Sequence, residues 1–168
     1  MIAQALAVQH PGQVSRLVLA ATQAGTGMSL PIPPAAQAAA ASSKPAVVLS
    51  VLFPADQAAA ARTYVAEILQ YPNPYTMPVA VKNTQTLAIQ QWMAGQNPAG
   101  PRLREVRAPT LVSEGTKDAL DPVANDWLLA RTLRDARLAL YPDAGHAFLF
   151  QDAAAFVPVV DEFLGLGR

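Results

Sequence analysis

The chain has 168 residues, of which 52% are hydrophobic and only 14% charged, and its formal net charge is zero. This length suits a single domain. A balanced charge does not attract nucleic acid or an anionic membrane by bulk electrostatics. The sequence contains no cysteine and 2 histidines, which excludes disulfides and thiolate metal sites and leaves little for an imidazole-based metal site.

The opening residues 1–11 are apolar but lack the basic segment and cleavage signal of a secretory leader. No segment reaches the roughly 18–20 continuous apolar residues of a membrane span. We therefore expect a cytoplasmic protein that engages neither a membrane nor nucleic acid. The excess of arginine over lysine, with heavy use of alanine and proline, is typical of a GC-rich bacterial genome.

The first part of the chain predicts a helix followed by a buried strand. Residues 2–9 are apolar and helical in character, and His10, Pro11 and Gly12 end this helix, which makes His10 a structural residue. Residues 16–22 are a continuous apolar run between turn signals. Such a run is typical of a strand buried on both faces of a parallel sheet.

Residues 23–101 differ in composition and predict a mostly helical insertion. Asp56 suits the N-cap of one of its helices, because an aspartate oxygen can accept the free N–H groups of a first turn. The expected elements are an irregular segment at 25–34, an alanine-rich helix at 35–41, an apolar stretch at 45–53 that fits helix or strand, a helix at 56–70 ended by Pro72 and Pro74, a helix at 78–93 and a loop at 95–101.

The last part of the chain alternates between strands and helices. The expected elements are a strand at 109–113, a helix opened by Asp121 and Pro122 that runs to about 133, a strand at 137–141 and a helix at 153–164. This alternation implies a parallel sheet with helices on its faces. We therefore expect an α/β core made of residues 1–22 and 102–168, interrupted by the insertion at 23–101.

Two residues that could carry chemistry follow neighbouring strands of this core. Asp118 lies just after the strand at 109–113, and His146 lies just after the strand at 137–141. Loops that leave the same ends of adjacent parallel strands, about 4.8 Å apart, can bring a carboxylate and an imidazole into hydrogen-bonding reach. The carboxylate would orient the histidine as a general base. Asp121 is an alternative acid, although its place before a proline favours capping, and Asp143 suits a turn.

The residues around this pair resemble the α/β-hydrolase family. The segments that carry the resemblance are Val106–Val112 with Gly115–Asp118, Pro122 and Asn125, then Ala144–His146, and at the start Met1–Gln4 through His10 and Pro11 to Leu17–Leu19. They are similar to the family's acid-bearing segment, its histidine loop and the helix and strand after its nucleophile elbow. The resemblance implies a partial α/β-hydrolase fold with about three parallel strands, flanking helices and a helical cap at 23–101.

The resemblance also implies a serine hydrolase that acts on a small ester or lactone without metal or organic cofactor. His146 would be general base and then general acid, and Asp118 would orient it. The superfamily also includes epoxide hydrolases, dehalogenases and cofactor-free haloperoxidases, so the reaction subtype stays open.

The family's serine stands in a G-x-S-x-G elbow directly before the first helix, and no G-x-S-x-G occurs in this sequence. The nucleophile is therefore expected a few residues before Met1, outside this chain, and the isolated chain is expected to be inactive. Ser29 is a weak fallback, because Gly27 starts the pattern but Pro31 replaces its second glycine. A dinucleotide loop at 25–27 is dismissed, since a third glycine is lacking.

Apolar residues are expected either to line a substrate pocket or to pack the insertion onto the core. The candidates for the pocket are Trp92, Met93 and Phe148, with Phe53, Tyr71 and Tyr75 as further aromatic residues of the insertion. A sheet of about three strands leaves an edge open. We therefore expect self-association or a complementary N-terminal half, and the alternative to an enzyme is a non-catalytic remnant that serves as an interaction module.

Overall fold

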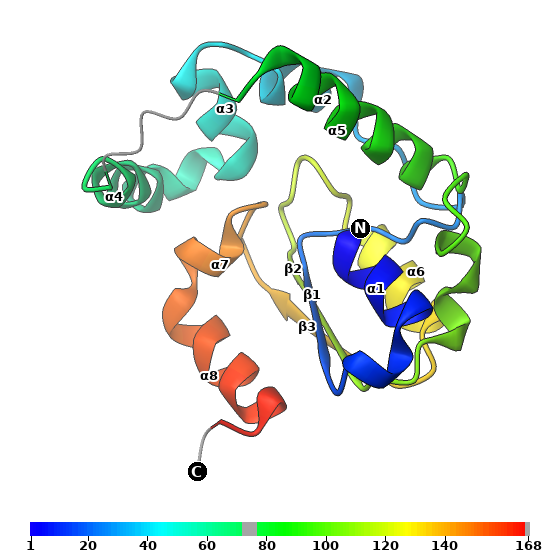
Figure 1. Ribbon diagram of the computed structural model, residues 1–168. Helices are drawn as coiled ribbons and strands as arrows, with labels where there is room; N and C mark the ends of the chain where they lie inside the picture. The colour runs from blue at the N-terminus through cyan, green and yellow to red at the C-terminus, as the bar shows by residue number, and fades with distance from the viewer. Residues whose placement is uncertain (72–76, 167–168) are drawn as a thin grey trace.

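The computed structural model describes residues 1–71 and 77–166 and contains a three-stranded parallel sheet (Figure 1). The strands are β1 (Leu17–Ala20), β2 (Thr110–Gly115) and β3 (Ala136–Tyr141), in the spatial order β1-β2-β3. In the register, Leu17 lies opposite Thr110, which lies opposite Ala136 on the other side. All six residues of β2 are buried, as is typical of the central strand of a parallel sheet that helices cover on both faces.

Helices cover both faces of the sheet, so the predicted fold class, a partial α/β-hydrolase fold, is confirmed. On one face lie α1 (Ile2–Gln9) and α6 (Ala124–Thr132), and on the other lie α7 (Phe148–Gln151) and α8 (Ala153–Leu164) (Figure 1). The bounds of α1 and α8 agree with the predicted ranges. Helix α8 ends at Gly165, whose φ of 76° is left-handed and suits glycine at this position.

Each face has its own hydrophobic cluster. Beneath α1 and α6, the buried side chains include Val8, Leu19, Val112 and Leu129. On the α8 face, Tyr141 and Phe148 are buried against Phe156, and their rings lie 4.9–5.9 Å apart. Burying these apolar groups supplies most of the drive to form the sheet.

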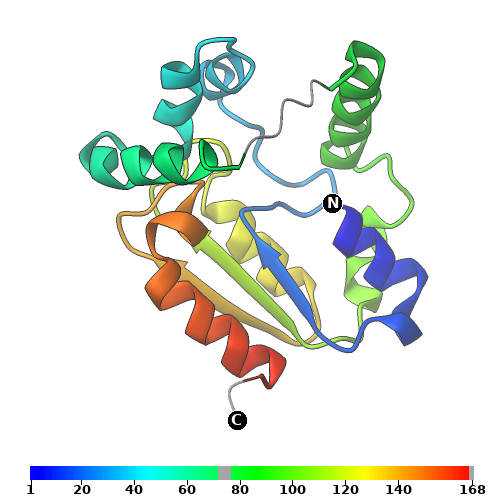
Figure 2. The same cartoon turned by 60° about the vertical axis from the view of Figure 1, so that its left-hand side comes forward.

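The described residues between β1 and β2 form mainly helices, which lie beyond the carboxyl ends of the strands (Figure 2). The helices are α2 (Pro34–Ala40), α3 (Pro45–Leu52), α4 (Ala58–Ile68) and α5 (Val79–Met93). The short 3₁₀ turns η2 (Ala55–Gln57) and η3 (Gly100–Glu105) lie in the same part of the chain, and η1 (Pro11–Gln13) precedes β1. The stretch at 45–53 that fitted helix or strand is therefore helix, with proline at its first position.

One expectation for this region is wrong. Asp56 does not cap α4, because the chain makes the 3₁₀ turn η2 first and the N-cap residue is Gln57. The Asp56 carboxylate is instead 2.9 Å from Lys117 Nζ, an ion pair with the loop after β2. Pro72, Pro74 and Tyr75 lie outside the described residues. Within the part of the chain that is described, no helix has both the length and the hydropathy to span a membrane.

Candidate active site

The loops after β2 and β3 meet at the carboxyl edge of the sheet. The backbone N–H of Lys117 donates to the Ala144 carbonyl at 2.8 Å, and that of Thr116 donates to the Tyr141 carbonyl at 2.9 Å. A Cβ atom on Gly115 would lie 2.4 Å from the carbonyl oxygens of Ala144 and Gly145. Only glycine therefore allows the two loops to approach this closely.

This approach brings Asp118 and His146 together. Oδ2 of Asp118 lies 2.7 Å from Nδ1 of His146, and Oδ1 accepts the backbone N–H groups of Leu120 at 2.6 Å and Asp121 at 2.8 Å. The Asp118 side chain is fully buried, whereas that of His146 is 29% exposed. A carboxylate held in this way orients the imidazole, keeps the proton on Nδ1 and leaves Nε2 to accept one.

His146 lines a pocket of about 330 Å³ between the sheet edge and the helices above it. A volume of this order is that of a small-molecule site. The lining residues are Met1, Ala21, Thr22, Gln23, Ile32, Ala40, Ile89, Trp92, Met93, Leu120, Asp121 and His146. Trp92 and Met93, which were proposed from the sequence, are among them. Trp92 also packs into the core, with its Nε1 donating to the Gln23 carbonyl at 3.3 Å.

Phe148 lies elsewhere. Its ring is fully buried on the α8 face and stacks on Tyr141 with a centroid distance of 4.9 Å, so it packs the core and does not line this pocket. Of the other aromatic candidates, Phe53 is buried against Tyr64, and Tyr71 is exposed on the surface. Phe148 therefore packs the α8 face of the sheet, and Phe53 packs against a neighbouring helix of residues 23–101.

Asp121 lies at the wall of the same pocket and does not cap the helix that follows. Helix α6 begins at Ala124, and its N-cap residue is Val123. The Asp121 carboxylate accepts a hydrogen bond of 2.6 Å from Asn125 Nδ2. Burial raises the pKa of Asp121 to about 6, although the bond from Asn125 opposes this shift. Asn125 also binds both backbone groups of Leu30, which attaches the segment after β1 to α6.

Two further acids lie beneath Asp118, and neither was among the residues predicted from the sequence. Glu114 and Asp126 are fully buried between β2 and α6. Burial, followed by the charges of Asp118 and Asp126, raises the pKa of Glu114 to about 11. Burial, followed by the charges of Asp121 and Asp118, raises the pKa of Asp126 to about 8. Burial therefore favours the protonated form of both acids. A glutamate inside the apolar run of β2 was the available signal.

Ser29 is not joined to His146 in this structure. Its hydroxyl donates to the Ala24 carbonyl at 2.8 Å, and no hydrogen bond between the two residues is present among residues 1–71 and 77–166. In the same described ranges, no group of three or more histidine, aspartate or glutamate side chains is placed to hold a metal ion.

The helices above the site are attached to the histidine loop. The backbone N–H of Ala147 donates to the Leu52 carbonyl at the end of α3, at 3.0 Å. A Cβ on Gly145 would lie 2.7 Å from that same carbonyl oxygen, so glycine is needed for this contact as well. Lys117 Nζ adds exposed ion pairs to Asp56 at 2.9 Å and to Asp143 at 2.8 Å.

Solved structures with the same fold are numerous. A structure described as Est816, an N-acyl homoserine lactone degrading enzyme, superposes with a TM-score of 0.73 at 26% identity, over 97% of this chain and 63% of its own. An α/β-hydrolase fold protein from Chitinophaga pinensis superposes with a TM-score of 0.73 at 18% identity, over 98% and 61%. The second likeness shows the fold alone.

Sequence relatives cover shorter stretches. A 2-hydroxy-6-oxononadienedioate/2-hydroxy-6-oxononatrienedioate hydrolase from Comamonas testosteroni is 30% identical over 95 residues, which are 56% of this chain and 32% of that protein. A poly(3-hydroxyalkanoate) depolymerase from Ectopseudomonas oleovorans is 40% identical over 62 residues, 37% of this chain and 22% of that protein. The chain thus spans less than two thirds of the length of these proteins.

The family described as serine aminopeptidase, S33, matches residues 1–153, which is most of the chain. The three parallel strands, the flanking helices and the order of the two loops agree with this match. The chain belongs to the serine aminopeptidase S33 family of the α/β-hydrolase superfamily.

Proposed function

We propose that Asp118 and His146 are the acid and the base of a serine-hydrolase triad. The observation that carries this proposal is the 2.7 Å contact between Asp118 Oδ2 and His146 Nδ1 beside a pocket that His146 lines. In the reaction, Nε2 of His146 takes the proton of a serine hydroxyl as the serine oxygen attacks the substrate carbonyl. The imidazolium then gives that proton to the leaving oxygen, and Asp118 stabilises the positive charge in between.

The serine of this proposal is supplied by residues outside the given sequence. No G-x-S-x-G occurs in the chain, and in this fold the elbow directly precedes the helix that corresponds to α1. Met1, just before α1, lies at the wall of the pocket that holds His146. A serine on an elbow before Met1 would therefore reach the same pocket, and the chain by itself is inactive in this proposal.

The substrate class that we propose is a small carboxylic ester or lactone. Its support is the name of the lactone-degrading enzyme, with 26% identity and a TM-score of 0.73, together with the uncharged character of most of the pocket wall. We further propose that residues 1–22 and 102–168 form the hydrolase core and that residues 23–101 form a cap over it, as the positions of α2 to α5 suggest.

A second candidate is a non-catalytic interaction module, favoured by the edge of β1 that no other strand of residues 1–71 and 77–166 pairs with. This strand pairs with β2 on one side, and α1 exposes Ile2 at 77% and Leu6 at 42%. Open edges and apolar surfaces recruit other chains. In this reading, the chain associates with itself or with a complementary N-terminal half.

Fluorophosphonate labelling tests the triad proposal. The chain is labelled alone and after mixing with an N-terminal segment of a relative that carries G-x-S-x-G, and adducts are located by intact mass and peptide mapping. We expect no adduct on the chain alone, and in the mixture an adduct on the elbow serine that is lost in His146→Ala. A histidine-dependent adduct on a serine of this chain, Ser29 included, would contradict the missing nucleophile. A mixture that forms a stable complex without any adduct would favour the interaction module.

A further inference from the structure

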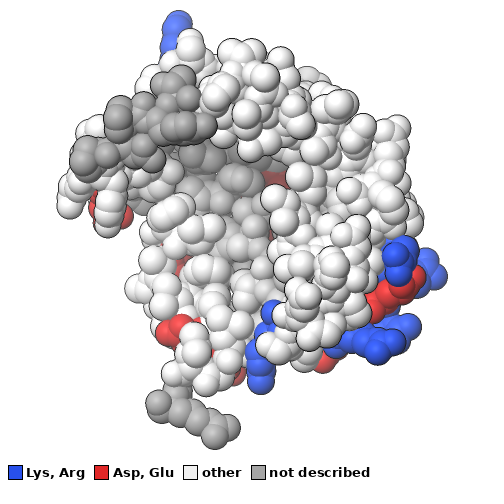
Figure 3. Space-filling model, in the orientation of Figure 1, with Lys and Arg blue, Asp and Glu red and all other residues white. Residues whose placement is uncertain are grey.

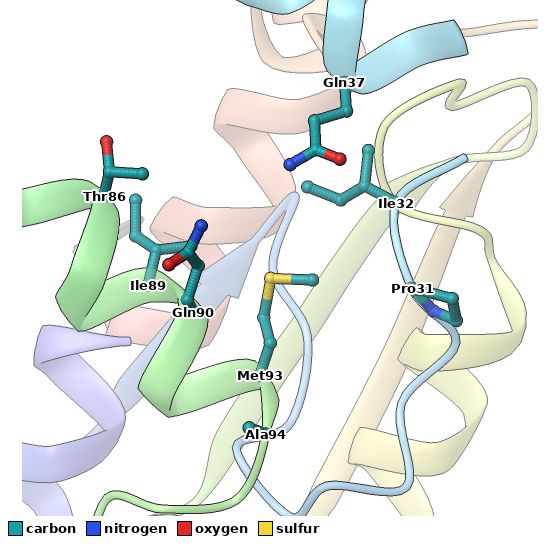
Figure 4. A pocket seen from close by; sticks show the side chains of 8 residues that line it. All are labelled: Pro31, Ile32, Gln37, Thr86, Ile89, Gln90, Met93 and Ala94. Carbon is teal, nitrogen blue, oxygen red and sulfur yellow. The ribbon is translucent and has the colours of Figure 1, made fainter. Parts of the chain in front are cut away.

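A second apolar hollow adjoins the pocket of His146. It has a volume of about 340 Å³ and shares three walls, Ile32, Ile89 and Met93, with that pocket. Figure 4 shows its side chains coming from three places: α5, the loop after β1, and Gln37 on α2. The lining residues are Pro31, Ile32, Gln37, Thr86, Ile89, Gln90, Met93 and Ala94. The common walls place the two hollows side by side, and the two together are called the groove below.

The second hollow is apolar and carries no charge. None of its lining residues is lysine, arginine, aspartate or glutamate, and its polar side chains are the neutral ones of Gln37, Thr86 and Gln90. In the view of Figure 3, most of the visible Lys and Arg side chains gather at the lower right of the molecule, away from the helices around the groove. A carboxylate that loses water in this hollow would find no cation among the lining residues, and burying an unpaired charge is costly.

The first pocket holds the ionisable groups. They are His146 and Asp121. The groove therefore has a polar end, where a reacting bond can sit, and an uncharged far end. The pocket of His146 therefore suits the reacting bond, and the second hollow suits an uncharged part of the substrate.

We infer that the second hollow binds the acyl chain of the substrate, and that this chain is apolar and ends without a charge. The inference rests on the proposed ester or lactone hydrolysis and adds its substrate class. The chain runs from His146 between Ile32 and Met93 toward Gln37 and Gln90. The two amides there suit a neutral hydrogen-bonding group, such as a hydroxyl or a carbonyl. A chain that ends in a carboxylate is expected to bind more weakly.

The test measures binding, so it does not depend on hydrolysis. The chain has 2 tryptophans, and Trp92 lines the first pocket while Trp127 is 52% exposed on α6. In a Trp127→Phe variant, Trp92 fluorescence therefore reports on the groove alone. The probes are methyl octanoate and monomethyl octanedioate, which match in chain length and differ by one terminal carboxylate.

We expect methyl octanoate to change the Trp92 emission saturably and to bind at least about tenfold more tightly than monomethyl octanedioate. Each methylene removed from the neutral ester weakens binding by roughly fourfold, which corresponds to about 0.8 kcal/mol per buried methylene. Equal affinity for the two esters, or no saturable binding of methyl octanoate to folded protein, overturns the inference. The triad proposal is judged separately by labelling, so the two failures are distinguishable.

A charge placed in the shared wall reverses the preference. Met93→Lys adds a cation between the two hollows. We expect this variant to bind monomethyl octanedioate at least about tenfold more tightly than the parent protein does, and to bind methyl octanoate more weakly. Ile89→Lys is the second variant if the first fails to fold. The matched control is Leu87→Lys, also on α5, because Leu87 is 54% exposed and lines neither hollow. An equal response in the control overturns the assignment of the groove.

Discussion

The sheet and the helices above it are built in different ways. All six residues of β2 are buried, whereas α4 has no buried residue and α5 has one, Trp92. Large apolar side chains stay exposed on these two helices, among them Ile68, Val79 and Leu87. The candidate acid and base therefore sit on loops held by a closely packed core. The walls proposed to recognise the substrate sit on helices that bury little, so this part is free to vary with less cost to stability.

A small number of contacts connect the two regions. Trp92 anchors α5 to the core, Asn125 holds the segment after β1, and the carbonyl of Leu52 binds the histidine loop. We call α2 to α5 the outer helices. If the two regions are as different as their burial indicates, substitutions at these contacts and in the core will lower the free energy of unfolding far more than substitutions on the outer helices.

The largest effect is expected at Trp92. Trp92→Ala removes a side chain that is 2% exposed and packs into the core cluster, so we expect a loss of roughly 3–5 kcal/mol in the free energy of unfolding. Urea denaturation followed by circular dichroism measures it. Leu87→Ala on the same helix is the matched control, and its cost is expected within about 0.5 kcal/mol. Similar losses for the two variants would mean that α5 is packed along its whole length.

The second effect concerns Asp126, whose pKa burial raises to about 8. Above about pH 4 the unfolded chain loses this proton while the folded protein keeps it, so stability falls as the pH rises toward 8. Asp126→Asn removes this term. We expect the free energy of unfolding of Asp126→Asn, relative to that of the parent, to increase by about 1.4 kcal/mol per pH unit between about pH 5 and 7. This relative gain is the advantage of the variant.

Urea denaturation at several pH values measures this advantage. The exposed Asp135 supplies the control substitution, Asp135→Asn, in which burial is absent. An advantage for Asp126→Asn that stays constant across this range would show that Asp126 is ionised in the folded protein.

A smaller loss is expected from Gly115→Ala. The new Cβ would meet two backbone carbonyl oxygens at 2.4 Å, which forces the loops apart. We expect a cost of roughly 1–3 kcal/mol and a longer contact between Asp118 and His146, which the NMR signal of the His146 Nδ1 proton reports. Gly12→Ala is the control, since nothing lies within 4 Å of its Cβ position. An unchanged proton signal in Gly115→Ala would show that the loops meet without needing this glycine.

The smallest effect is expected at Lys117. Its ion pairs with Asp56 and Asp143 join the outer helices to the core, but all three side chains are at least 42% exposed. Exposed pairs are screened by water and salt, so we expect Lys117→Met to leave the denaturation midpoint close to that of Lys82→Met, another exposed lysine. A clear difference that disappears in 1 M salt would show that this network does hold the two regions together.

Much of the fold could be predicted because it depends on local patterns. The apolar runs at 16–22 and 109–113 and the proline and glycine signals around 10–12 identified the strands and helices in the right order. The proximity of Asp118 and His146 also followed from the sequence, since both come directly after neighbouring parallel strands. Even so, the prediction that Asp56 and Asp121 cap helices was wrong. The Asp56 carboxylate pairs with Lys117 in a distant loop, and the Asp121 carboxylate accepts a hydrogen bond from the Asn125 side chain.

The sequence by itself determined the order of the elements, the parallel sheet and the pair of residues at its edge, because each depends on residue type and spacing along the chain. Only the tertiary structure decided what surrounds that pair. The raised pKa values of Glu114 and Asp126, the place of Phe148 in the core and the two adjoining hollows depend on burial between packed elements. Burial and the loss of water that comes with it arise only when such elements pack together, so no local pattern encodes them.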